Sequence, residues 1–89
     1  MTLNSFMNEN GIVWEYPYPC ILTILTKGKE AIYWVDPDGF RKTSYFIKVD
    51  ANENIIEKIS FKDFNNNIEY LFENGWINTG FFENLKEWG

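Results

Sequence analysis

The chain has 89 residues, of which 45% are hydrophobic, 19% aromatic and 24% charged. It has enough apolar side chains to form a core, which excludes an intrinsically disordered protein. Its length predicts a single small domain over residues 1–89. The net charge of −5 at pH 7 argues against direct binding of nucleic acid, because contacts with phosphates need a basic surface. A basic protein is the partner that this charge favours.

The absence of histidine and the presence of a single cysteine exclude several kinds of active site. The chain has no histidine, so it cannot build the Ser–His or Cys–His pairs of nucleophilic catalysis, or a histidine-based zinc site. Its one cysteine, Cys20, cannot form an internal disulfide, which agrees with a reducing compartment. No apolar run approaches the ~20 residues that span a bilayer, and the first residues lack the features of a secretory signal. We therefore expect an unprocessed cytoplasmic protein that is not an enzyme, crosses no membrane and needs no cofactor.

The first ten residues predict a short helix. Thr2 is a suitable N-terminal cap, and Leu3 and Met7 follow at helical spacing. The pair Asn10-Gly11 marks the exit, since glycine readily adopts the left-handed conformation in which helices often end.

Residues 12–20, IVWEYPYPC, alternate aromatic and other side chains. Two prolines remove two backbone donors, so this stretch predicts an edge strand or an extended segment and not a central strand. Its rings are expected to pack over the edge of a sheet.

Four β-rich runs are separated by turn signals, at residues 20–26, 30–36, 43–50 and 54–61. Lys-Gly-Lys between the first two runs predicts a hairpin, and Asp-Pro-Asp-Gly after the second matches a type I turn. The last two runs alternate apolar and polar residues, which predicts one covered face and one wetter face of a sheet.

Beyond Ser60 the apolar period lengthens from two residues to about 3.6, which predicts a helix over residues 64–74. Ser60 or Asp63 is its expected cap. A final helix is predicted over residues 79–88, with Thr79 as its cap. The predicted fold class is α+β: a four- to five-stranded antiparallel meander sheet, with a short N-terminal helix and two C-terminal helices packed on one face.

Two polar turns resemble metal-binding loops. The stretch Asp50–Asn54 places oxygen ligands at alternate positions, as a calcium-binding EF-hand loop does. However, Ile55 stands where that loop needs glycine, and Phe61 stands where it needs a bidentate glutamate. The turn at residues 36–39 offers only two carboxylates, next to basic residues. We interpret both as plain polar turns and predict no metal site.

Two pairs of glutamates stand out on the predicted C-terminal helices. In each pair the carboxylates lie one turn apart and opposite the apolar stripe. Like charges at this spacing cost about 0.2–0.5 kcal/mol per pair, so the pairs either keep the protein soluble or form a docking surface rimmed by nearby tryptophans. The predicted partner-binding residues are Glu69, Glu73, Trp76, Glu83, Glu87 and Trp88.

These features favour a non-enzymatic protein-binding inhibitor, of the immunity or anti-defence type, that neutralises a basic partner such as a toxin or nuclease. Abundant residues with AT-rich codons indicate a low-GC bacterium or its phage. The alternative is a phage or mobile-element accessory protein that self-associates through the aromatic stretch at residues 14–20. A third hypothesis is a small-ligand or nucleic-acid binder that uses Trp34 on the wetter face of the sheet. A monomer is favoured.

Overall fold

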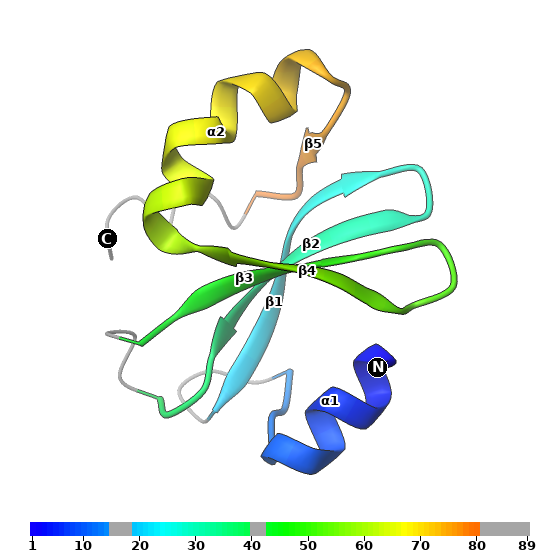
Figure 1. Cartoon of the computed structure of the whole chain (residues 1–89), viewed down its shortest axis with the longest axis vertical. Coiled ribbons are helices and arrows are strands. Elements are labelled where there is room, and N and C mark those ends of the chain that lie inside the picture. The colour runs from blue at the N-terminus through cyan, green and yellow to red at the C-terminus, as the bar shows by residue number, and fades with distance from the viewer. Residues whose placement is uncertain (15–18, 40–42, 81–89) are drawn as a thin grey trace.

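The computed structural model describes residues 1–14, 19–39 and 43–80. Within these residues, two helices and five strands form an α+β fold (Figure 1). In chain order the elements are α1 (Leu3–Asn10), β1 (Cys20–Lys27), β2 (Glu30–Asp36), β3 (Tyr45–Val49), β4 (Ile55–Ser60), α2 (Phe61–Glu73) and β5 (Ile77–Asn78). Neither of these helices is long and apolar enough to cross a membrane.

All five strands belong to one antiparallel sheet, with the order β4-β3-β2-β1-β5. Strands β1 to β4 form the predicted meander, in which each strand pairs with the next along the chain. Gly28, with a φ of 60°, supplies the left-handed residue of the β1–β2 turn. Strand β5 was not predicted. It adds to the other edge of the sheet, where it pairs with Leu25 and Thr26 of β1.

The two faces of the sheet carry separate apolar clusters, because side chains alternate along each strand. In β2, Ile32 and Trp34 point to one face, whereas Tyr33 and Val35 point to the other. The buried residues of the first cluster, here called the α2-side core, are Cys20, Ile24, Leu25, Ile32, Trp34, Phe46, Phe64 and Trp76. Those of the second cluster, the α1-side core, are Leu3, Met7, Ile12, Ile21, Val35, Ile47 and Val49.

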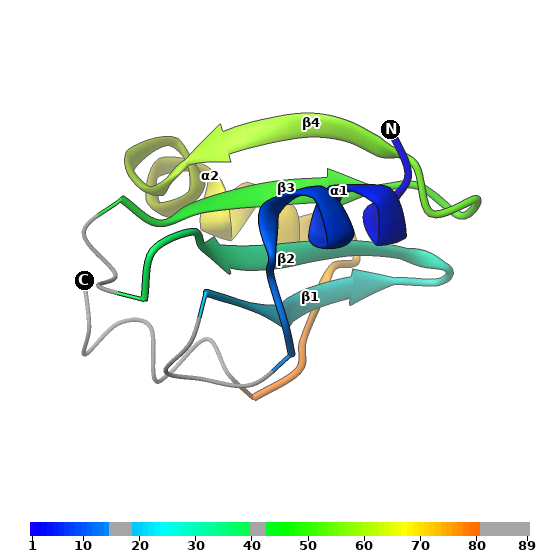
Figure 2. The ribbon, with the colours of Figure 1, turned by 90° about the horizontal axis from the view of Figure 1, so that it is seen from below.

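The two helices lie over opposite faces of the sheet (Figures 1 and 2). Helix α1 contributes Leu3 and Met7 to one core, and α2 contributes Phe64 to the other. The sequence led us to expect all helices on one face. The difference arises because the central strands are apolar on both sides: Phe46 and its neighbour Ile47 are both buried, on opposite faces of β3. Each face therefore needs its own cover.

Both described helices begin at the predicted caps. The Thr2 hydroxyl accepts a hydrogen bond from the Ser5 amide (3.2 Å), and the Ser60 hydroxyl accepts one from the Asp63 amide (3.1 Å). Helix α1 ends at Gly11, whose φ of 62° is left-handed as expected. These bonds satisfy amides that a helix start otherwise leaves without a partner, so the local sequence defines where each helix begins.

The segment before β1 is described only in part. Val13 donates its amide to the Pro19 carbonyl (2.9 Å) and accepts from the Ile21 amide (3.0 Å), which places it beside the start of β1. This agrees with an extended stretch at a sheet edge. Most of the aromatic stretch, residues 15–18, lies outside the described residues.

The expected final helix begins where the described chain ends. The Thr79 hydroxyl, its predicted cap, donates to the carbonyl oxygens of Thr23 (2.7 Å) and Ile24 (3.0 Å) in β1. Thr79 therefore ties the segment after β5 to the sheet. Residues 81–89, which contain most of the predicted helix, lie outside the described residues.

Candidate protein-binding surface

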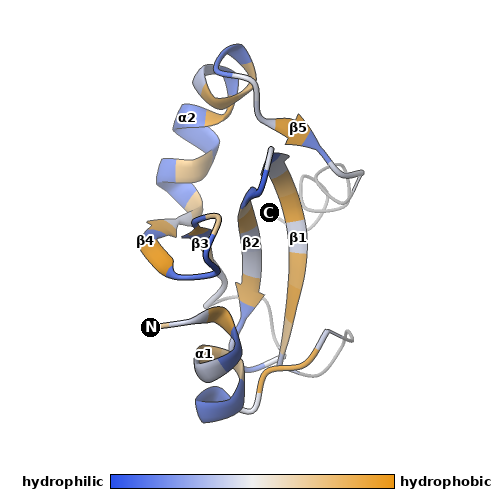
Figure 3. Ribbon diagram, turned by 90° about the vertical axis from the view of Figure 1, so that its right-hand side faces the viewer, coloured by the Kyte–Doolittle hydropathy of each residue, from blue (hydrophilic) through white to orange (hydrophobic). Residues whose placement is uncertain are grey.

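Helix α2 carries the first predicted glutamate pair on its solvent side. Glu69 and Glu73 are both exposed and lie one turn apart. The last turn of α2 contains no basic residue that would pair with them. Figure 3 shows that the outward turns of α2 are largely hydrophilic, whereas strand β1 is mostly hydrophobic. The predicted acidic face is therefore present on this helix.

The charges of α2 run against the helix dipole. Lys62, a cation, lies in the first turn, and Glu73, an anion, lies in the last. The N-terminal end of a helix favours anions and its C-terminal end favours cations, each by about 0.3–1 kcal/mol. Only Asp63 follows that preference. The carboxylates near the end of α2 thus lower the stability of their own helix.

Large apolar side chains flank this acidic row. Tyr70 is 64% exposed and Phe72 is 40% exposed, on either side of the line from Glu69 to Glu73. We call these four residues the acidic–aromatic surface. Exposed aromatic rings are enriched at the centres of protein interfaces, where they supply much of the binding energy, whereas charged residues lie mainly at the rim.

Trp76 does not belong to this surface, which corrects its predicted role at the rim. The residue is only 6% exposed and is part of the α2-side core. Gly75, with a φ of 94°, reverses the chain after α2, and the Trp76 amide then donates to the Leu71 carbonyl (3.1 Å). The chain thereby returns to the sheet and carries the indole inward, so Trp76 offers little area to a partner.

The remaining predicted residues cannot be placed. Glu83, Glu87 and Trp88 lie outside the described residues. The structure therefore brings together only Glu69 and Glu73 of the predicted set, and it adds Tyr70 and Phe72. Sequence reasoning missed these two rings because it placed Phe72 on the apolar stripe of the helix and did not single out Tyr70. Helical spacing alone could have found Tyr70, which lies well away from the apolar stripe of α2.

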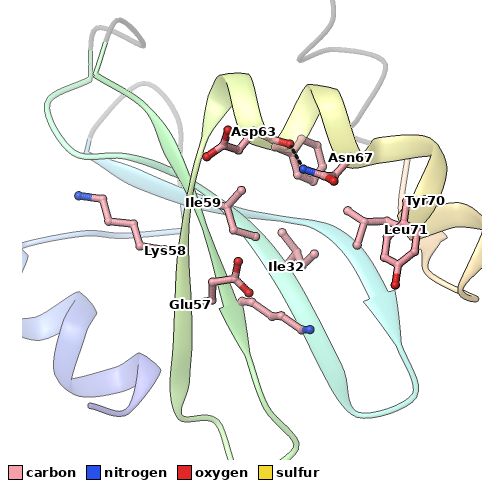
Figure 4. Close-up of a pocket in the computed structure, with 10 residues that line it drawn as sticks. Ile32, Glu57, Lys58, Ile59, Asp63, Asn67, Tyr70 and Leu71 are labelled. Carbon is pink, nitrogen blue, oxygen red and sulfur yellow. Dashed lines mark hydrogen bonds between the residues drawn. The ribbon is translucent and has the colours of Figure 1, made fainter.

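A cleft of about 350 Å³ lies between α2 and the strands β2, β3 and β4 (Figure 4). Its apolar lining comes from both layers: Ile32, Ile59, Phe64 and Leu71. Its polar lining consists of Lys48, Glu57, Lys58, Asp63, Asn67 and Tyr70. The volume falls in the range of small-molecule and side-chain pockets. Tyr70 belongs to both the cleft and the acidic–aromatic surface, so the two adjoin.

The two lysines of the cleft differ in where their charges lie. The Lys58 ammonium is 4.3 Å from the centroid of the Tyr45 ring, on the α1 side of the sheet, and Figure 4 shows this side chain directed away from Ile32 and Leu71. The Lys48 ammonium lies 5.5 Å from the centroid of the Trp76 ring. Of the two lysines in this lining, only Lys48 therefore has its ammonium on the α2 side of the sheet.

Trp34, the residue proposed for ligand stacking on the sheet, is not accessible. Trp34 is 1% exposed, and Phe46 is fully buried against Phe64, with ring centroids 3.9 Å apart. Trp34 therefore cannot stack a base or ligand in this structure, which removes the site of the third hypothesis. The face that was expected to be wet is covered by α2.

The polar turns use their carboxylates for local hydrogen bonds. One oxygen of Asp50 accepts from the amides of Asn52 and Asn54, both at 2.9 Å, and Asp36 accepts from the Gly39 amide at 3.1 Å. Within the described ranges, no three histidine, cysteine or carboxylate side chains gather as a metal site would require. The turn interpretation accounts for both sequences.

Among the residues that the structure describes, burial raises the pKa values of three side chains. It raises the pKa of the Cys20 thiol to about 11, with a smaller contribution from the Asp36 carboxylate. It also raises the pKa of Tyr33, where Glu53 adds to the effect, and that of Tyr45. A thiol with so high a pKa is not a reactive nucleophile at neutral pH. These shifts therefore indicate packing.

Comparison of the chain with models of protein families, with curated proteins and with solved structures found no match.

Proposed function

We propose that the chain is a protein-binding domain that captures a basic partner protein on the acidic–aromatic surface of α2 and blocks it. The observation that carries this proposal is the pair of like charges Glu69 and Glu73, of which Glu73 lies in the last turn of the helix, where an anion is unfavourable and no basic residue is present. A solubility role does not require this position, because carboxylates at the start of the helix would serve equally well and would stabilise it.

A cationic partner would relieve this unfavourable arrangement. Lysine or arginine side chains brought to Glu69 and Glu73 would offset both the like-charge repulsion and the helix dipole. The net charge of −5 would also steer a basic protein toward the domain and raise its association rate. Tyr70 and Phe72 then supply the apolar contact that slows dissociation. This mode of action is that of an immunity or anti-defence protein that neutralises a toxin or nuclease.

Charge reversal tests the proposal. The tagged chain captures proteins from a lysate of its source cell, and the captured proteins are compared with those held by E69K/E73K and by E9K/E53K. The second variant changes the net charge by the same amount at exposed positions on the α1 side. We expect a basic protein that the wild type and E9K/E53K retain and that E69K/E73K loses.

Association kinetics with that protein complete the test. E69K/E73K should slow association by at least about tenfold at low salt, and the difference should shrink as salt screens the charges. The proposal is contradicted if both variants slow association equally, because bulk charge and not this surface would then be responsible. It is also contradicted if neither variant changes capture.

A further inference from the structure

The cleft beside α2 has a lining rich in hydrogen-bond acceptors. The Asn67 amide nitrogen donates to the Asp63 carbonyl (2.8 Å), and its Oδ1 accepts nothing from any described residue. The Glu57 carboxylate and the Tyr70 hydroxyl likewise make no hydrogen bond or ion pair with the described part of the chain. Figure 4 shows Glu57 on the strand side of the cleft and Asn67 and Tyr70 on the helix side, around Ile32 and Leu71. The acceptors therefore surround an apolar floor.

Charge adds to this preference. The lining includes two carboxylates, Glu57 and Asp63, and two lysines, Lys48 and Lys58. The Lys58 ammonium lies over the Tyr45 ring, and Figure 4 shows the Asp63 carboxylate directed away from Ile32 and Leu71, so Glu57 supplies the carboxylate of the cleft itself. Lys48 pairs across the β3–β4 register with Glu57, but its charge lies toward the Trp76 ring. The free acceptors and the Glu57 carboxylate favour a cationic ligand that donates many hydrogen bonds, and the apolar floor favours one with an apolar stem.

We propose that this cleft is a pocket for an arginine side chain. A guanidinium has five N–H donors and no acceptor, so it can donate to the Glu57 carboxylate and to the Asn67 oxygen without opposing an acceptor of its own to theirs. Its planar group stacks on an exposed ring such as Tyr70, and its methylene stem packs on Ile32 and Leu71. Lysine is a weaker match, because its compact ammonium cannot span donors to both sides of the cleft.

This inference rests on the proposed function, since it names the residue that the basic partner would insert next to the acidic–aromatic surface. Tyr70 links the two, as a member of that surface and of the cleft lining. Glu69 and Glu73 would then steer the partner, and the cleft would hold one of its arginines. The test below uses peptides and needs no partner protein, so it succeeds or fails independently of the capture experiment.

The probe is the capped peptide acetyl-Gly-Arg-Gly-amide, added to the isotopically labelled chain and followed by amide NMR. Its matched control is the same peptide with citrulline, which keeps the shape of arginine and lacks its charge. We expect saturable shifts at the amides of Lys48, Glu57, Asn67 and Tyr70, with a dissociation constant in the millimolar range for so small a ligand. The citrulline peptide should bind at least about threefold more weakly.

Three variants give effects of opposite sign. Glu57→Gln and Tyr70→Ala should each weaken binding of the arginine peptide by about threefold to tenfold, because they remove a charged acceptor and the stacking ring. Lys48→Gln should tighten binding by about twofold to threefold, because it removes a like charge. Glu9→Gln on α1 carries the same charge change as Glu57→Gln at an exposed site outside the cleft and should leave the dissociation constant unchanged.

Several results would overturn the arginine pocket. Equal binding of the citrulline peptide would show that charge plays no part. Weakening by Glu9→Gln as large as that by Glu57→Gln would show general attraction to an acidic protein. Weaker binding of the arginine peptide to the Lys48→Gln variant would show that the Lys48 charge does not oppose the ligand, against a cationic occupant of the cleft. Shifts confined to residues outside the cleft would place the peptide elsewhere. If E69K/E73K loses the protein partner while the peptide fails to bind, the proposed function stands without the arginine pocket.

Discussion

The two faces of the sheet are covered in different ways. On one face the 13-residue helix α2 packs through aromatic rings, with Phe46 stacked on Phe64 at 3.9 Å and tilted against Phe61 at 5.3 Å. On the other face the eight-residue helix α1 packs through aliphatic side chains and buries Leu3 and Met7. That face adds half-buried tyrosines and backbone bonds from the N-terminus to the β3–β4 turn.

This difference explains why α2 can carry an unfavourable outer surface. Its inner face contributes enough burial that a cost of about 1 kcal/mol from misplaced charges is tolerated. Helix α1 is shorter, with eight residues against thirteen, and its ends follow the capping preferences closely. A candidate binding surface is thus found on the longer of the two helices.

The largest expected effect comes from Phe64→Ala, which removes the ring that joins α2 to the sheet. We expect the free energy of unfolding to fall by about 3–5 kcal/mol, because the ring is 1% exposed and leaves a cavity. Urea denaturation measures the loss. Tyr70→Ala is the control on the outer side of the same helix, where the ring is 64% exposed, and should cost less than about 1 kcal/mol.

Met7→Ala makes the corresponding change on the α1 face. We expect a smaller loss, about 2–3 kcal/mol, since Met7 is 7% exposed and packs from a short helix. The same urea experiment applies. A loss as large as that of Phe64→Ala would show that the two covers contribute equally, against the comparison made above.

Glu73→Lys should stabilise the protein. Lysine at this position complements the helix dipole and forms a favourable pair with Glu69 one turn earlier, for a gain of about 0.5–1 kcal/mol. A thermal melt compared with that of wild type would record a higher midpoint. A lower midpoint would mean that Glu73 has a stabilising contact that its exposure does not suggest.

The smallest effect on stability at neutral pH is expected from the ionisation of the tyrosines on the α1 face. The folded-state pKa values of Tyr33 and Tyr45 are raised by burial above the ordinary value of 10.0, so the folded protein disfavours their ionised forms. Their contribution to stability is complete below about pH 10 and is lost as pH rises through the folded-state values. Phenolate absorbance would follow the titration, and Tyr33→Phe should make alkaline unfolding less steep.

Local signals predicted most of the fold. The caps at Thr2 and Ser60, the turn at Gly28 and the four-strand meander all depend on residues close together in the chain. Strand β5 depends on contacts with β1 across more than fifty residues, such as Thr79 with Thr23, and no local pattern encodes them.

The candidate site was predictable only in part, for the same reason. Helical spacing placed Glu69 and Glu73 on the solvent face, because that position depends on a single helix. Burial of Trp76 depends on the turn at Gly75 and on the sheet behind it. The cleft is lined by Glu57 from a strand and by Tyr70 from a helix. The periodicity of each element gives its own faces but does not show how the two elements pack together.

Strand β4, at one edge of the sheet, has Glu57 and Lys58 near its centre. If a second copy extended the sheet across this edge with two-fold symmetry, opposed residues would have to point to the same face. A centred pairing would then set Lys58 against Lys58 of the second copy, or Glu57 against Glu57, and like charges directly opposite destabilise a sheet. The adjacent opposite charges therefore act as a barrier to edge-to-edge aggregation.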